Sequence, residues 1–137
     1  MITLKNKDLI AVCQLLKQTE LLLKVSRIRT KLVKLIQVKI EDFYKDELEL
    51  VEKFGKRNET GELLETDGSF TLVTDTAQTY HHEKAILLDE EIQIDVAELK
   101  AKLPILIEAF ENSDMTVSGD EAETLDLLME KLEEEET

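Results

Sequence analysis

The sequence predicts an α+β fold: a mostly helical single domain over residues 1–137, with four or five helices and a small antiparallel sheet. A helical period runs from Leu21 to Phe54, Asp67-Gly68 separates two short apolar runs, and residues 92–96 alternate between apolar and polar side chains. A chain of 137 residues can bury one modest core. Because aromatic residues make up 4% of the chain and Trp is absent, that core must consist mainly of Leu, Ile and Val.

The first part of the chain is expected to be helical. Asn6 is a candidate N-cap for a first helix, whose apolar stripe includes Cys13. We therefore expect Cys13 to be a buried hydrophobic residue and not a nucleophile. A second, longer helix should end at Phe54, followed by Gly55 in the left-handed conformation.

The middle of the chain predicts the sheet. Residues 63–66 and 69–73 are expected to form a β-hairpin, because Asp67-Gly68 readily adopts the positive φ angles of a type I′ turn. A hairpin alone is marginal, and residues 92–96 are the best candidate for its third strand. A short helix is expected between them, over residues 76–88.

The last part of the chain should again be helical. A helix is expected from Asp95 to about Asn112, and Pro104 should either kink it or mark its true first turn. A final helix should begin at Ser118. Its last residues, 133–137, are expected to fray because they place carboxylates at the negative end of the helix.

Charge divides the chain into a basic N-terminal half, 1–57, and an acidic half, 58–137. The first holds 13 Lys+Arg and 8 Asp+Glu, a balance of +5, and the second holds 4 and 23, a balance of −19. This asymmetry indicates either that the halves contact each other or that one of them faces a charged partner.

A basic patch lies early in the long helix, in a stretch without acidic residues. It is a candidate site for an anionic partner, because arginine and lysine side chains there combine with a serine hydroxyl. Alternatively, it pairs with the acidic half of the same chain or of a second copy. The net charge of −14 argues against direct binding of nucleic acid. The patch consists of Lys24, Arg27, Arg29, Lys31 and Lys34.

An acidic face is expected on the last helix, where carboxylates recur every three or four residues. Such a row can imitate the phosphate backbone of a nucleic acid and occupy the channel of an enzyme. It can equally be a solvated surface that keeps the protein soluble. The face consists of Asp120, Glu123, Asp126, Glu130 and Glu133.

No motif in the sequence indicates catalysis, so we expect a protein that is not an enzyme and needs no cofactor. The phosphate-binding patterns GxxxxGK[ST] and GxGxxG are absent, as is the GxSxG pattern of acyl transfer. His81 and His82 are adjacent, and on a helix they point about 100° apart, which disfavours a shared metal ion. No apolar run reaches the length of a membrane span, and a cytoplasmic protein is expected.

Residues 26–35, Ser-Arg-Ile-Arg-Thr-Lys-Leu-Val-Lys-Leu, resemble a sequence motif of an uncharacterised protein family, domain of unknown function family 1617. Phages and prophages of Gram-positive bacteria carry the proteins of this family. The similarity extends over nearly the whole chain, including the Asp-Gly turn and the Ser118-Gly119 start of the acidic helix. The region around Tyr80 has no counterpart in that resemblance. The family has no established activity, and the resemblance implies a phage product made inside a bacterial cell.

These observations lead to one expected function and one alternative. The first is a non-enzymatic phage protein that binds another protein, as a virion-assembly or accessory protein, with a phage structural protein or a second copy as its partner. The alternative is an inhibitor of a host defence enzyme, such as an anti-CRISPR-like nucleic-acid mimic that uses the acidic face. Neither requires a cofactor, a membrane or direct contact with nucleic acid.

Overall fold

The computed structural model describes residues 1–66, 69–72 and 76–136. The chain forms two compact units: unit 1 comprises residues 1–40 and 91–137, and unit 2 comprises residues 41–90. Within the described residues there are five α-helices and two small antiparallel sheets, so the predicted α+β, mostly helical fold class is confirmed. The change from basic to acidic sequence at residues 57 and 58 falls inside unit 2.

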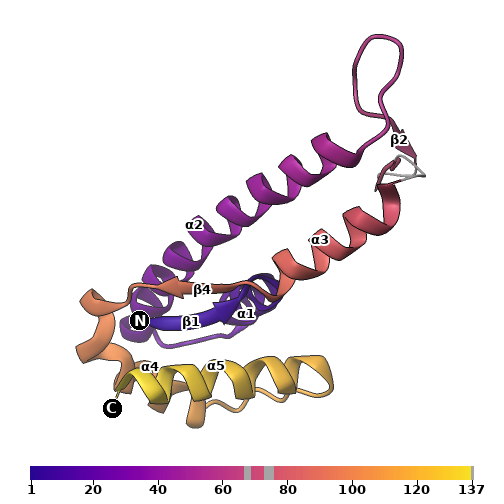
Figure 1. Cartoon of the computed structure of the whole chain (residues 1–137). Helices are drawn as coiled ribbons and strands as arrows, with labels where there is room; N and C mark the ends of the chain where they lie inside the picture. Colours follow the sequence, from indigo (N-terminus) through magenta and orange to yellow (C-terminus); the bar gives the residue numbers. More distant parts are fainter. Residues whose placement is uncertain (67–68, 73–75, 137) are drawn as a thin grey trace. The chain divides into compact units, whose positions relative to one another are not determined.

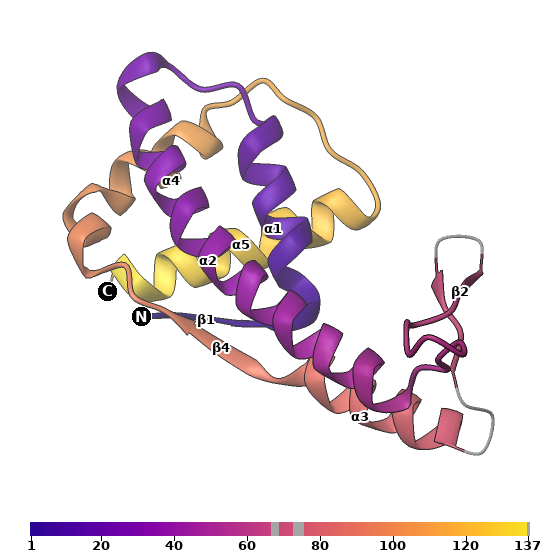
Figure 2. The same ribbon diagram turned by 90° about the horizontal axis from the view of Figure 1, so that it is seen from above.

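The sheet of unit 1 joins the start of the chain to a distant strand. β1 (Ile2–Lys5) pairs with β4 (Glu91–Ile94) in antiparallel register, with Ile2 opposite Ile94 (Figures 1 and 2). The prediction that residues 92–96 add a third strand to the hairpin is therefore wrong. β4 pairs with β1 because Ile2, Leu4 and Ile94 all bury their side chains in the same core.

The helix α1 (Asn6–Gln18) follows β1 directly. Lys5, and not the expected Asn6, holds the N-cap position, with extended backbone angles. Asn6 is the first helical residue and is 2% exposed. The helix thus begins one residue earlier than the N-cap prediction implied, directly after the last residue of β1.

The long helix α2 (Leu23–Phe54) contains 32 residues and runs from unit 1 into unit 2. Its apolar period continues through both units. In unit 1 the inward side chains include Val25, Ile28, Leu32 and Ile36.

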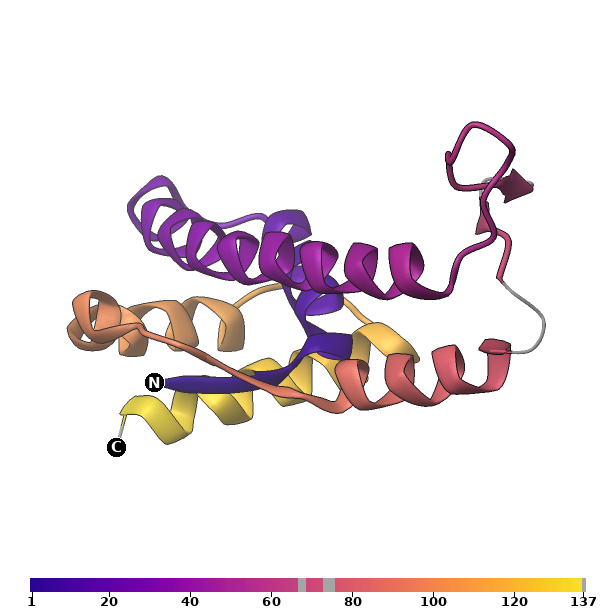
Figure 3. The ribbon, with the colours of Figure 1, turned by 45° about the horizontal axis from the view of Figure 1, so that its top comes forward.

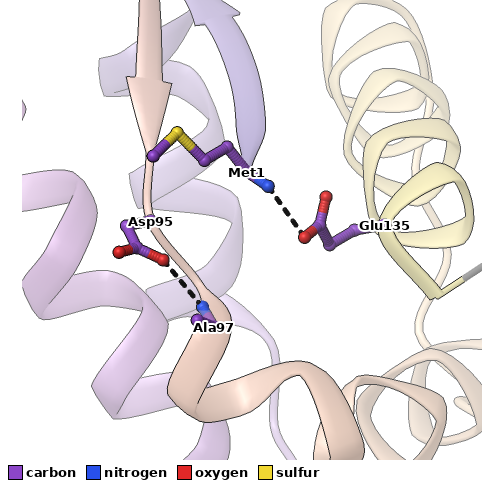
Figure 4. Close-up of polar contacts among 4 residues, drawn as sticks. All are labelled: Met1, Asp95, Ala97 and Glu135. Carbon is purple, nitrogen blue, oxygen red and sulfur yellow. Dashed lines mark hydrogen bonds and ion pairs between the residues drawn. The ribbon is translucent and has the colours of Figure 1, made fainter.

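The C-terminal part of unit 1 begins with the 3-10 helix η2 (Ala97–Lys102), which runs into α4 (Leu103–Glu111). The Asp95 carboxylate accepts a hydrogen bond of 3.0 Å from the N–H of Ala97, the first residue of η2 (Figure 4). Pro104 occupies the first turn of α4, where its missing N–H costs nothing, so the second of the two readings of Pro104 is confirmed.

The last helix, α5 (Asp120–Glu136), starts two residues after the expected Ser118. Gly119 precedes it with a φ of 58°, a conformation that favours glycine. The helix buries Leu128 and Leu132, while Leu125 and Met129 are half-buried. It extends through Glu136, beyond the start of the tail that we expected to fray.

One core unites the elements of unit 1. In the views of Figures 1 and 3, α1 lies between the first part of α2, residues 23–40, and α5. Each of these helices contributes side chains that are less than 2% exposed. The largest are Leu9, Leu16, Leu32, Ile36, Ile94, Leu103, Leu106, Leu128 and Leu132.

Unit 2 is built from the second part of α2, a hairpin and a helix. β2 (Glu65–Thr66) pairs with β3 (Ser69–Phe70), as expected, and the predicted turn at residues 67–68 lies outside the described residues. The helix α3 (Ala77–Asp89) follows within one residue of its predicted bounds. Its Tyr80 ring packs edge-on against Phe54, with 6.1 Å between ring centroids.

Gly55 ends α2, but its φ is not positive, so the predicted left-handed termination is wrong. The glycine is required for space. A Cβ at this position would lie 2.5 Å from the Val51 carbonyl oxygen and 2.7 Å from Cδ2 of Leu63. The chain after α2 therefore turns closely over the last helical turn, which only glycine permits.

Candidate functional site

Four of the five predicted basic side chains form a single exposed row on α2. The first is Lys24, and the others follow three, seven and ten residues later. This spacing places all four along one face of the helix, away from its buried side. Within the part of the chain that the structure describes, no carboxylate lies within ion-pair distance of any of them. We call this set the basic row: Lys24, Arg27, Lys31 and Lys34.

Arg29, the fifth predicted basic residue, makes contacts of a different kind. Its guanidinium Nη1 donates to the carbonyl oxygens of Thr19 and, at 3.4 Å, Leu16, and Nη2 donates to Oγ of Ser26 at 2.8 Å. These carbonyls belong to the C-terminal end of α1, whose partial negative charge a cation stabilises. Arg29 thus links α1 to α2, while the basic row faces solvent.

The predicted acidic residues all lie on α5 and are all exposed. Within the described part of the chain no lysine or arginine pairs with them. Four of them, beginning at Glu123, follow one another after three, four and three residues. They lie on the side of the helix opposite the buried Leu128 and Leu132. We call these four the acidic row: Glu123, Asp126, Glu130 and Glu133. Asp120 lies one turn earlier, at the start of α5.

Two neighbouring carboxylates of α5 do have partners. The N-terminal ammonium of Met1 donates to Oε1 of Glu135 at 2.8 Å (Figure 4), and Lys131 lies 3.8 Å from Glu134. Neither contact involves a member of the acidic row: Glu135 lies on another face of the helix, and Glu134 lies beside the row, one turn after Glu130. The end of α5 is thus only partly neutralised by its own unit.

The structure does not bring the two rows together within unit 1. Residues 23–40 of α2 and the helix α5 lie on either side of α1 in Figures 1 and 3, and both helices turn their apolar faces into the shared core. Pairing of the basic row with the acidic row of the same chain, one of the readings of the sequence, is therefore not formed. The rows remain available to other molecules.

A groove beside the start of the basic row was not foreseen from the sequence. It lies between the α1–α2 connection and the end of α4, and has a volume of about 990 Å³. Leu22, Lys24, Ile105 and Met115 are among its lining residues. Leu22 is 70% exposed and the adjacent Leu23 is 90% exposed, although both are large apolar side chains. The run Leu21-Leu22-Leu23 was the available signal, because one face of a helix start cannot bury three consecutive leucines.

The remaining candidates for chemistry have ordinary surroundings. Cys13 is buried, as predicted, and burial raises the pKa of its thiol, an effect that the charge of Lys17 partly opposes. His81 and His82 are both exposed, and the His81 ring packs edge-on against Tyr80 at 5.3 Å. Among the described residues, no group of three or more histidine, cysteine, aspartate or glutamate side chains is arranged to hold a metal ion.

Comparison with family models identifies a match over the whole chain, residues 1–137. The chain belongs to the DUF1617 family. The description of DUF1617 is a protein of unknown function, so membership assigns no activity to the two rows or to the groove. A comparison with curated proteins and with solved structures finds no match in either. The DUF1617 chain also has no helix, among the residues described, that is both long and apolar enough to cross a membrane.

Proposed function

We propose that this DUF1617 protein is a non-enzymatic, phage-encoded protein that acts by binding another protein, as a virion-assembly or accessory protein in the bacterial cytoplasm. The observation that carries the proposal is the unpaired basic row of α2 next to the exposed Leu22 and Leu23. The phage origin rests on the similarity of residues 26–35 to the phage and prophage family described above. The partner that fits this surface is acidic and offers an apolar anchor.

The two parts of this surface have different tasks. Exposed ion pairs contribute about 0.2–1 kcal/mol each, so the basic row mainly orients the partner and speeds its arrival. Burying a leucine side chain contributes about 1.5–3 kcal/mol, so Leu22 and Leu23 provide most of the affinity. Many protein–protein interfaces have this arrangement, in which charged residues at the rim surround apolar residues at the centre.

The test is cross-linking in cells. A photo-reactive amino acid replaces Leu23 in the full chain, which is produced in infected host bacteria, and the cross-linked product is identified by mass spectrometry. We expect one dominant protein adduct, which the pair Arg27→Glu and Lys31→Glu abolishes. The matched control pair Lys100→Glu and Lys102→Glu makes the same charge change at exposed positions on η2 and should leave the adduct intact. A pattern of adducts that both pairs leave unchanged would contradict the proposal.

A second function is favoured by the acidic row, which is exposed and without cationic partners among the described residues. In this case the protein inhibits a host defence enzyme by occupying its nucleic-acid channel with regularly spaced carboxylates. The variant Glu123→Gln, Asp126→Asn and Glu130→Gln should then weaken inhibition without loss of folding. Equal inhibition by the variant and the parent would exclude this role for the row.

A further inference from the structure

We propose that the basic row of one copy of this chain binds the acidic row of a second copy. The inference rests on the proposed assembly function and names its first partner. Its basis is a match in spacing. Lys24, Arg27, Lys31 and Lys34 are separated by three, four and three residues, and the acidic row has the same separations. Each row therefore extends about 15 Å along its helix, at 1.5 Å per residue.

The spacing three, four, three reads the same in both directions, so the helix ends decide the orientation. The first turn of α2 contains Lys24 and no acidic residue, although the N-terminal end of a helix favours negative charge. The last turn of α5 contains Glu133 and no basic residue, although that end favours positive charge. An antiparallel arrangement places each of these ends against the charge that it lacks.

In this arrangement four ion pairs form at matching positions. Lys24 faces Glu133 of the second copy at one end. Each further ion pair lies about one helical turn along both helices. The helices approach through solvent-exposed faces, so no core side chain has to move. The full set is Lys24 with Glu133, Arg27 with Glu130, Lys31 with Asp126, and Lys34 with Glu123.

The position of the rows determines the type of assembly. Because α2 residues 23–40 and α5 lie on opposite sides of α1, one contact uses the basic row of one copy and the acidic row of the next, and leaves one row free on each copy (Figures 1 and 3). Such a head-to-tail contact repeats, and it produces a ring if the rotation closes and a filament if it does not. Exposed ion pairs are weak and screened by salt, so association requires high protein concentration and low ionic strength.

The experiment is sedimentation velocity on the full chain at increasing concentration, at ionic strengths of about 30 mM and about 500 mM. We expect species larger than a dimer at low salt and the monomer at high salt. Two variants then each reverse the two central charges of one row: Arg27→Glu with Lys31→Glu, and Asp126→Lys with Glu130→Lys. Each should raise the dissociation constant by on the order of tenfold or more when measured alone.

The decisive measurement mixes the two variants. The first variant keeps an intact acidic row and the second an intact basic row, and their two altered rows also match in charge. The equimolar mixture should therefore associate at low salt under conditions in which neither variant does so alone. The pair Lys100→Glu and Lys102→Glu is the control and should associate like the parent. Circular dichroism of each variant confirms that it is folded, and complex formation in the mixture also shows that both are.

Three results would overturn the inference: a parent chain that stays monomeric at low salt, reversals that leave association unchanged, or a mixture that stays unassociated. The cross-linking test described above distinguishes these failures from failure of the proposed function. A monomeric chain that still forms an adduct dependent on the basic row binds a different protein. A chain that self-associates without such an adduct in cells assembles only with itself.

Discussion

Unit 1 and unit 2 share one continuous helix and differ sharply in how they bury apolar surface. Unit 1 has a core of twenty buried apolar side chains from β1, α1, α2, β4, α4, α5 and the segment between β4 and α4. The described part of unit 2 buries four: Phe43, Val51, Phe54 and Leu87. Unit 2 adds polar and aromatic contacts, including the ion pair of Lys84 with Glu47 and the approach of Lys84 Nζ to 5.7 Å from the Phe43 ring centroid.

The difference teaches that a helix can keep its apolar face buried in a unit that otherwise buries little. Phe43, Val51 and Phe54 of α2 are buried in unit 2, as Leu32 is in unit 1, but outside α2 the described part of unit 2 buries only one apolar side chain, Leu87. We therefore expect most of the stability of the chain to reside in unit 1, and unit 2 to open at lower free energy.

The largest effect should follow from Leu32→Ala, because it removes a fully buried side chain from the core of unit 1. The free energy of unfolding should fall by about 2–5 kcal/mol, measured by urea denaturation followed by circular dichroism. Leu48→Ala, the same change at an exposed position of the same helix, should alter it by less than about 0.5 kcal/mol. Similar losses in the two variants would contradict the contrast between the units.

A smaller, local effect is expected for Gly55→Ala, because the new methyl group collides with the Val51 carbonyl oxygen and with Leu63. The cost should be about 1–3 kcal/mol and should appear as faster hydrogen exchange in residues 41–90, with unit 1 still protected. Gly61→Ala is the control for strain without collision, since Gly61 has a φ of 86° and open space around it. An alanine at position 55 without any cost would show that α2 does not end in this close turn.

The smallest effect should come from Arg29→Met, which keeps an unbranched apolar stem and removes the hydrogen bonds to the carbonyls of Thr19 and Leu16. We expect a loss of about 1–2 kcal/mol, seen as a lower thermal midpoint, because the end of α1 loses its cationic partner. The matched variant Arg27→Met changes an exposed member of the basic row and should stay within about 0.5 kcal/mol of the parent. Equal effects at positions 27 and 29 would mean that both arginines face solvent.

Sequence reasoning found the features whose signal is local. Helical periodicity located α2 closely, the Asp-Gly pair located the hairpin, and the first turn of α4 was one of the two alternatives given for Pro104. Both charged rows could also be named in advance, because exposed side chains at helical spacing are defined by the helix alone.

Sequence reasoning failed where the structural role of a residue depends on another part of the chain. β1 contains four residues and is recognisable as a strand only from its pairing with β4. In the sequence Arg29 cannot be distinguished from the nearby Arg27. Their roles differ because the fold places the C-terminal end of α1 within hydrogen-bond distance of Arg29. Gly55 was predicted at the right place for the wrong reason, since its requirement for space comes from the Val51 carbonyl oxygen and from Leu63 across the turn.

The pairing of β1 with β4 also determines when the protein can fold during its synthesis. The first strand leaves the ribosome long before its partner, because residues 6–90 must be translated between them. Until residues 91–136 follow, the apolar faces of α1 and of the start of α2 have no core to enter. Translation that stops in this interval therefore yields an unfolded polypeptide with exposed apolar surface, which cellular proteases and chaperones would recognise. It does not yield a partly functional protein.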